Sequence, residues 1–236
     1  MNSTHIVKNP RDRLIVALDF PEPSQGLDLV CDLARDVAIF KVGLQLFTAG
    51  GPEIVRAITA TGAKVFLDLK LHDIPNTVAR AVAAAGKLGV SMLTLHLAGG
   101  RQMIAAAVAE CPPDLLLLGV TVLTSADETM LREIGVDAGV SDHVVRLAQL
   151  GVEAGIGGLI ASPHEVRMLR AGAGEKLVII TPGIRPSGAV ADDQKRFTTP
   201  QEAVQLGADY LVIGRPITAD PEPREAVQKI IAELEA

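Results

Sequence analysis

The chain has 236 residues, of which 48% are apolar and 21% charged, so it carries enough apolar material for a core and is not an intrinsically disordered protein. Its 22 basic and 28 acidic residues give a formal charge of −6, and only 3% of its residues are aromatic. This charge argues against a nucleic-acid or anionic-membrane surface, and the few aromatic residues argue against a base-stacking platform. An anionic ligand would therefore need a local cluster of basic residues.

The two cysteines, Cys31 and Cys111, have neither CxxC pairing nor metal-ligand spacing, which is typical of reduced thiols in a cytoplasmic protein. The first residues are polar and lack the apolar core of a secretory signal. The longest apolar stretches, such as Leu115–Leu123, have the length of a strand and are too short to span a bilayer. We therefore expect a cytoplasmic protein that does not enter a membrane.

Short runs rich in leucine and β-branched residues recur along the chain, and most of them are continuously apolar. Such runs are typical of strands that are buried on both faces of a parallel sheet. The predicted strands are Leu14–Phe20, Ile39–Leu44, Lys64–Lys70, Met92–Leu97, Leu115–Leu123, Gly158–Ser162, Leu177–Gly183 and Tyr210–Arg215.

Ala-rich stretches with helical spacing lie between these strands. The predicted helices include Thr77–Leu88, Gln102–Glu110 and Asp142–Glu153. Glycine accepts the left-handed conformation that commonly ends a helix. The predicted helix stops are Gly62, Gly89, Gly151 and Gly207.

Alternation of eight strands with helices, without a linker-like segment, predicts a parallel sheet. We predict a single domain over residues 1–236, folded as an α/β (β/α)8 TIM barrel, for which ~250 residues are typical. A doubly wound open sheet is the alternative, because periodicity alone does not reveal whether the sheet closes.

Polar residues follow the apolar strands at their carboxyl ends, where α/β barrels carry their active sites. Asp19 ends the first strand, Lys41 lies in the second, and the third carries Asp68 and Lys70, with Asp73 in the loop beyond it. A charge inside a buried strand is costly unless it is paired. The array therefore indicates a functional site, and a salt bridge at the barrel rim is the structural alternative.

Side chains alternate along a strand, so Asp68 and Lys70 are predicted to share a face, with Leu69 opposite and Asp73 in the next loop. Neighbouring carboxylates favour a protonated Lys70. An ammonium is a poor nucleophile or general base, but it can stabilise a developing carbanion and donate a proton to it.

The segments after strands seven and eight are common phosphate sites in barrels. Gly214 allows close approach of the backbone and Arg215 supplies a forked donor, although an ordinary turn with a solvated arginine has the same pattern. The polar stretch before the last strand carries Arg185 and Gln194, and we predict a phosphate-binding lid over residues 183–197.

Four of the five histidines, His72, His96, His143 and His164, show no HxH or HExxH spacing, and lysines beside the acidic residues would compete with a cation. We therefore predict no metal site.

The segment FLDLKLHDIPNTV, Phe66–Val78, resembles the bacterial DxKxxDIPxT signature of the orotidine 5′-phosphate decarboxylase family. DxKxxD alone is shared with sugar-phosphate decarboxylases and aldolase-like synthases, but seven matching blocks in order are specific. The other six blocks are Ala17–Asp19, Phe40–Gly43, Thr121–Ser125, Thr181–Pro186, Asp192–Arg196 and Val212–Ile217.

The resemblance implies conversion of orotidine 5′-monophosphate to UMP and CO2, the last step of pyrimidine synthesis, without metal or organic cofactor. It implies catalytic roles for Lys70, which would protonate C6, for Asp68 near the departing carboxylate, and for Asp73. It also implies a homodimer in which Asp73 and Thr77 reach into the partner's site.

The same resemblance assigns the other substrate contacts. The ribose hydroxyls would be bound by Asp19 and Lys41, the pyrimidine edge by Thr124, and the phosphate by Arg185, Gln194, Gly214 and Arg215. We expect Ile74 and Pro182 to supply a small apolar pocket for the base, since aromatic residues are scarce. Two alternatives remain: a metal-dependent sugar-phosphate decarboxylase of the same superfamily, and a non-catalytic nucleotide-binding barrel.

Overall fold

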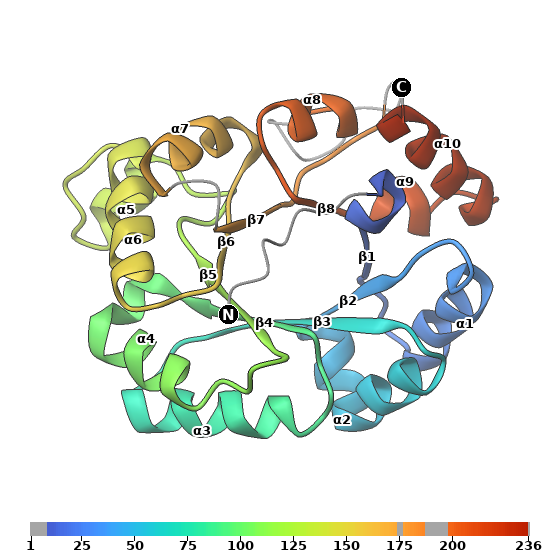
Figure 1. Ribbon diagram of the computed structural model, residues 1–236, viewed down its shortest axis with the longest axis horizontal. Helices are drawn as coiled ribbons and strands as arrows, with labels where there is room; N and C mark the ends of the chain where they lie inside the picture. Colours follow the sequence, from blue (N-terminus) through green and yellow to red (C-terminus); the bar gives the residue numbers. More distant parts are fainter. Residues whose placement is uncertain (1–8, 174–176, 187–197, 236) are drawn as a thin grey trace.

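A computed structural model describes residues 9–173, 177–186 and 198–235. Each strand pairs in parallel with the next along the chain, and β1 pairs with β8, so the sheet closes into a barrel (Figure 1). The predicted (β/α)8 fold is confirmed, and the open sheet is excluded. The strands are β1 Leu14–Leu18, β2 Ile39–Gly43, β3 Lys64–Leu71, β4 Met92–His96, β5 Leu116–Val120, β6 Gly158–Ile160, β7 Val178–Thr181 and β8 Tyr210–Ile213.

The helices surround the barrel (Figure 1). Proline at the first turn favours the start of α1, α3 and α8, because its missing N–H has no partner there. The helices are α1 Pro23–Leu33, α2 Leu44–Ala60, α3 Pro75–Gly86, α4 Gly100–Ala109, α5 Glu128–Glu133, α6 Val140–Glu153, α7 Pro163–Ala173, α8 Pro200–Gln205, α9 Arg215–Thr218 and α10 Pro223–Glu235, with short 3-10 turns η1 Pro10–Arg13 and η2 Leu97–Gly99.

Each predicted strand and helix overlaps an observed element, with ends that differ by up to a few residues, but one predicted helix stop is wrong. Gly62, Gly89 and Gly207 do adopt positive φ after helices. Gly151 instead lies inside α6 and is buried, and a Cβ there would come within 2.8 Å of the Leu97 side chain. Its small size thus allows close packing of α6 against η2, and α6 runs on to Glu153.

Two apolar clusters occupy the two faces of the sheet. Strand residues such as Leu14 and Val16 join helix residues in the larger cluster, which therefore lies between sheet and helices. Alternate strand residues fill the barrel interior: Ile15, Ala17, Ile39, Phe66, Met92, Leu118, Val178, Ile180 and Val212. Burial on both faces explains why the strands read as continuously apolar.

Of the helices in the described ranges, none combines the length and the apolar character required to cross a membrane.

Candidate active site

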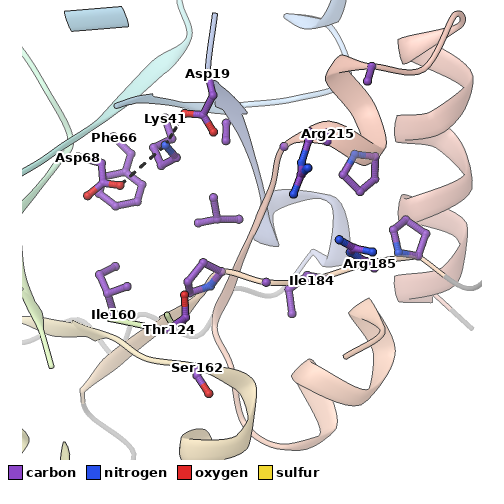
Figure 2. A pocket seen from close by; sticks show the side chains of 18 of the residues that line it. Asp19, Lys41, Phe66, Asp68, Thr124, Ile160, Ser162, Ile184, Arg185 and Arg215 are labelled. Atoms are coloured by element: carbon purple, nitrogen blue, oxygen red, sulfur yellow. Dashed lines mark hydrogen bonds and ion pairs between the residues drawn. The ribbon is translucent and has the colours of Figure 1, made fainter. Parts of the chain in front are cut away.

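A cavity of about 920 Å³ opens where the strands end at their carboxyl termini. The polar residues that line it continue the inward-facing columns of the strands, because Asp19, Lys41 and Asp68 each stand two residues after an interior residue. Figure 2 shows these three side chains close together on one side of the cavity. The period of two that fills the barrel with apolar side chains thus directs the charged ones into its mouth.

The four charges at this end alternate in sign. Lys41 Nζ lies 3.0 Å from Asp19 Oδ1 and 3.8 Å from Asp68 Oδ2, and Lys70 Nζ lies 2.9 Å from Asp68 Oδ2. The Lys41 and Asp68 side chains are only 11% and 13% exposed, so water screens their attraction weakly. The array keeps an ammonium beside a carboxylate at the wall of the cavity, where it can act on a bound ligand.

The Lys70 backbone departs from a regular strand. Leu67 pairs with Leu93 and Leu71 with Leu95, so Asp68, Leu69 and Lys70 stand opposite the single residue between those two partners. Lys70 has a positive φ of +52°. It is the only non-glycine residue in the described ranges whose φ is positive. The left-handed region costs a residue with a Cβ about 1–2 kcal/mol. Strain of this kind often marks functional sites.

This bulge corrects one step of the sequence argument. Alternation in a flat strand was expected to bring Asp68 and Lys70 together, with Leu69 opposite. The two side chains do meet and Leu69 does pack on the helix side, but through a β-bulge. A bulge changes the direction of the side chain at its end, here Lys70. A rule based only on alternating residues does not predict a bulge.

Sequence reasoning missed Thr94, the β4 residue opposite the bulge. Its hydroxyl accepts a hydrogen bond from Lys70 N at 2.8 Å and donates one to Asp68 Oδ1 at 2.9 Å. The residue is fully buried. Its signal was its position two residues after the interior residue Met92, which directs a polar side chain into the barrel.

Two histidine rings stand beside the array, with the centroids of His72 and His96 5.7 Å apart. Burial lowers the pKa of His96, and the nearby His72 and Lys70 lower it further, against a smaller opposite effect of Asp68. His96 is therefore neutral near pH 7. Among the described residues, no three His, Cys, Asp or Glu side chains are grouped so as to hold a metal ion.

The basic residues predicted for the phosphate line the opposite side of the cavity. Figure 2 shows Arg185 and Arg215 across from Asp68 and Lys41. Arg185 is buried, and its backbone N–H donates to the Thr198 carbonyl at 3.1 Å. Gly214, also in the lining, precedes α9 and adopts φ −112° and ψ −103°. Gln194 and most of the predicted 183–197 lid lie outside the described residues.

Thr124 and Pro182 line the cavity, as expected. Ile74 does not: it is 66% exposed, outside the cavity of the single chain, so its predicted place beside Pro182 is not found there. The neighbouring Asp73 and Thr77, on either side of the first residue of α3 at Pro75, are exposed as well and do not line the cavity of the single chain. The lining also includes apolar residues that were not singled out from the sequence, among them Phe66, Val122, Ile160 and Val212.

Comparison with known proteins supports one assignment. Residues 12–230 match the family described as Orotidine 5′-phosphate decarboxylase / HUMPS family. The orotidine 5′-phosphate decarboxylases of Moorella thermoacetica and Opitutus terrae are 49% and 50% identical to this chain, covering 95% and 94% of it and 93% and 98% of their own lengths.

A crystal structure of orotidine 5′-phosphate decarboxylase from Lactobacillus acidophilus superposes with a TM-score of 0.84 at 36% identity, over 95% of this chain and 100% of that one. The family match extends over nearly the whole chain, and the closed barrel and the charge array at its mouth are consistent with it. The chain therefore belongs to the orotidine 5′-phosphate decarboxylase / HUMPS family.

Proposed function

We propose that this protein decarboxylates orotidine 5′-monophosphate to UMP and CO2, in pyrimidine biosynthesis. The observation that carries the proposal is the placement of the Lys70 ammonium, 2.9 Å from the Asp68 carboxylate at the cavity wall, with two arginines on the far side. This spacing of a reacting centre and an anion site suits a substrate whose phosphate lies far from the bond that breaks. The relatives named above carry this activity in their names.

The reaction needs only a proton and electrostatic support. The bond from C6 to the carboxylate carbon breaks, CO2 leaves, and the electron pair stays on C6. Lys70 stabilises that carbanion and gives it a proton, after which solvent reprotonates the amine. Asp68 holds the ammonium in place and lies beside the departing carboxylate.

The remaining contacts follow the lining of the cavity. Asp19 and Lys41 bind the ribose hydroxyls, while Thr124 meets the pyrimidine edge beside Pro182. The phosphate is held by Arg185, Gly214 and Arg215, which line the cavity. Gln194 and the lid predicted over residues 183–197 complete this phosphate site in the proposal, although most of that segment lies outside the described residues. Binding energy from the phosphate then positions the base, so orotidine without phosphate should lose turnover rate as well as affinity.

The protein acts as a homodimer in this proposal. Asp73 and Thr77 are exposed on the α3 rim, beside Ile74 at 66% exposure, and Leu44 at the start of α2 is 57% exposed. Large apolar side chains in contact with water favour burial against another surface. A second copy would cover them, and it would bring Asp73 and Thr77 to the partner's cavity.

Mixing the purified protein with orotidine 5′-monophosphate and following ultraviolet absorbance tests the activity. Turnover that persists in EDTA supports the proposal. No turnover with this substrate, combined with EDTA-sensitive turnover of a sugar phosphate, would favour the metal-dependent alternative. Tight UMP binding without turnover of any substrate would favour a nucleotide-binding barrel.

Subunit complementation tests the dimer. Asp73→Ala and Lys70→Ala chains are each expected to be inactive, but a mixed dimer would contain one cavity with both native residues. Activity that appears on mixing, together with a dimer mass in light scattering, supports a shared site. A dimer whose mixture stays inactive would place Asp73 in its own chain's site.

A further inference from the structure

We propose that Thr94 is a positioning residue for the reaction, because its hydroxyl holds both the backbone of Lys70 and the carboxylate of Asp68. This inference rests on the proposed function. Thr94 does not line the cavity, so it acts through the two charged residues and not on the substrate.

The hydroxyl has one proton and uses it on Asp68 Oδ1, at 2.9 Å. The same oxygen accepts the Lys70 N–H at 2.8 Å, at the point where the register of β3 and β4 shifts. One buried group therefore ties the two ends of the bulge together. Because it donates to one end and accepts from the other, an apolar residue of the same shape cannot replace it.

The position of the Lys70 ammonium depends on this link. Left-handed φ at Lys70 is unfavourable by itself, so the surrounding contacts must maintain it. Asp68 accepts from Lys70 Nζ through both carboxylate oxygens, each at 2.9 Å, and Thr94 fixes which way that carboxylate faces. Without the hydroxyl, the backbone and the carboxylate are free to turn, and the ammonium no longer stays where C6 would be.

Lys41 gives a contrast within the same array. Its nearer partner is Asp19 Oδ1 at 3.0 Å, whereas Asp68 Oδ2, on the carboxylate that Thr94 holds, is 3.8 Å away. Ribose and phosphate binding should thus survive the loss of the hydroxyl. The inference predicts a selective loss of chemistry with ligand binding preserved.

Thr94→Val tests this, since valine keeps the shape and β-branching of threonine and removes only the hydroxyl. Losing a buried hydrogen bond to a charged group should lower kcat about 10- to 100-fold. KM, and the Kd for UMP measured by calorimetry, should change less than about 3-fold. Thr94→Ser restores the hydroxyl and should recover most of the rate.

Thr121→Val is the matched control. Thr121 is also buried, at 3% exposure, and its hydroxyl donates to the main-chain carbonyl of Ile160 at 3.2 Å without touching a charge. The control should lose a comparable amount of thermal stability and keep kcat. If Thr94→Val proves insoluble, Thr94→Ala removes the same hydroxyl.

The outcomes separate the two proposals. If the wild-type protein does not turn over orotidine 5′-monophosphate, the proposed function fails first. If the wild-type protein is active and Thr94→Val has the same kcat as the control Thr121→Val, Thr94 has no positioning role. A fall in kcat that Thr94→Ser does not rescue, or an equal loss of UMP binding, would also overturn the inference.

Discussion

Replacing Lys70 by glycine and, separately, by alanine separates the chemistry of its side chain from the strain of its backbone. Both variants remove the ammonium 2.9 Å from Asp68, and both leave Asp68 with Lys41 at 3.8 Å and the Thr94 hydroxyl. They differ in one respect: alanine keeps a Cβ at φ +52°, and glycine does not.

The structure sets the size of the difference. Relief of left-handed strain favours the glycine variant by about 1–2 kcal/mol. The greater conformational freedom of glycine in the unfolded chain reduces this advantage by about 0.5–1 kcal/mol. Lys70→Gly should therefore be more stable than Lys70→Ala by about 0.5–1 kcal/mol. For a chain of this size that is a difference in Tm of a few degrees.

Urea and thermal unfolding of the two variants measure this difference, and Lys64 supplies the control. Lys64 begins β3 with an exposed side chain and without positive φ, so glycine there should be less stable than alanine. Strain at Lys70 is supported if the glycine variant is more stable than the alanine variant at position 70 and less stable at position 64. If the glycine variant is the less stable one at both positions, strain at Lys70 is refuted.

Activity of the same two variants tests the proposed role of the ammonium. Loss of both proton donation and carbanion stabilisation should lower kcat about 10⁴-fold or more while the barrel stays folded by circular dichroism. Substantial turnover in either variant would contradict the assignment of Lys70 as proton donor.

Three further changes test the surroundings of the array. A Cβ at Gly43 would lie 3.1 Å from Lys41 Nζ, so Gly43→Ala should displace that ammonium. The variant should raise KM several-fold more than it lowers kcat, and an unchanged KM would argue against ribose binding by Lys41. Burial, chiefly, lowers the pKa of His96 below 6.5, so the unfolded chain binds this proton more readily and stability should fall as pH drops below about 6.5. Urea titrations should show a shallower acid loss in His96→Gln, and identical slopes would contradict the reasoning. Burial, and secondarily a nearby aspartate, raises the pKa of the Cys111 thiol, so a thiol reagent should label the exposed Cys31 first. Mass spectrometry of partly labelled protein measures the order of labelling, and earlier labelling of Cys111 would contradict this expectation.

Much of the site was visible in the sequence because barrels impose a simple rule. Polar residues that interrupt an apolar strand at its carboxyl end must face the barrel mouth, and this placed Asp19, Lys41 and Asp68 correctly. The same rule placed Thr124 and Pro182. Ile74 was expected beside Pro182 for a different reason, the scarcity of aromatic residues, and in the single chain it is exposed outside the cavity, just before α3.

The sequence by itself determined the eight strands, their order and the chemistry of the residues at their ends, because burial on both faces and the period of two leave a direct mark on the pattern of side chains. Only the tertiary structure decided that the sheet closes, since the pairing of β1 with β8 joins residues about 200 positions apart and has no local signal. It alone revealed the bulge at Lys70, whose left-handed backbone is held by Thr94 on the neighbouring strand. A conformation that local propensity disfavours has to be maintained by distant contacts, and those exist only in the folded chain.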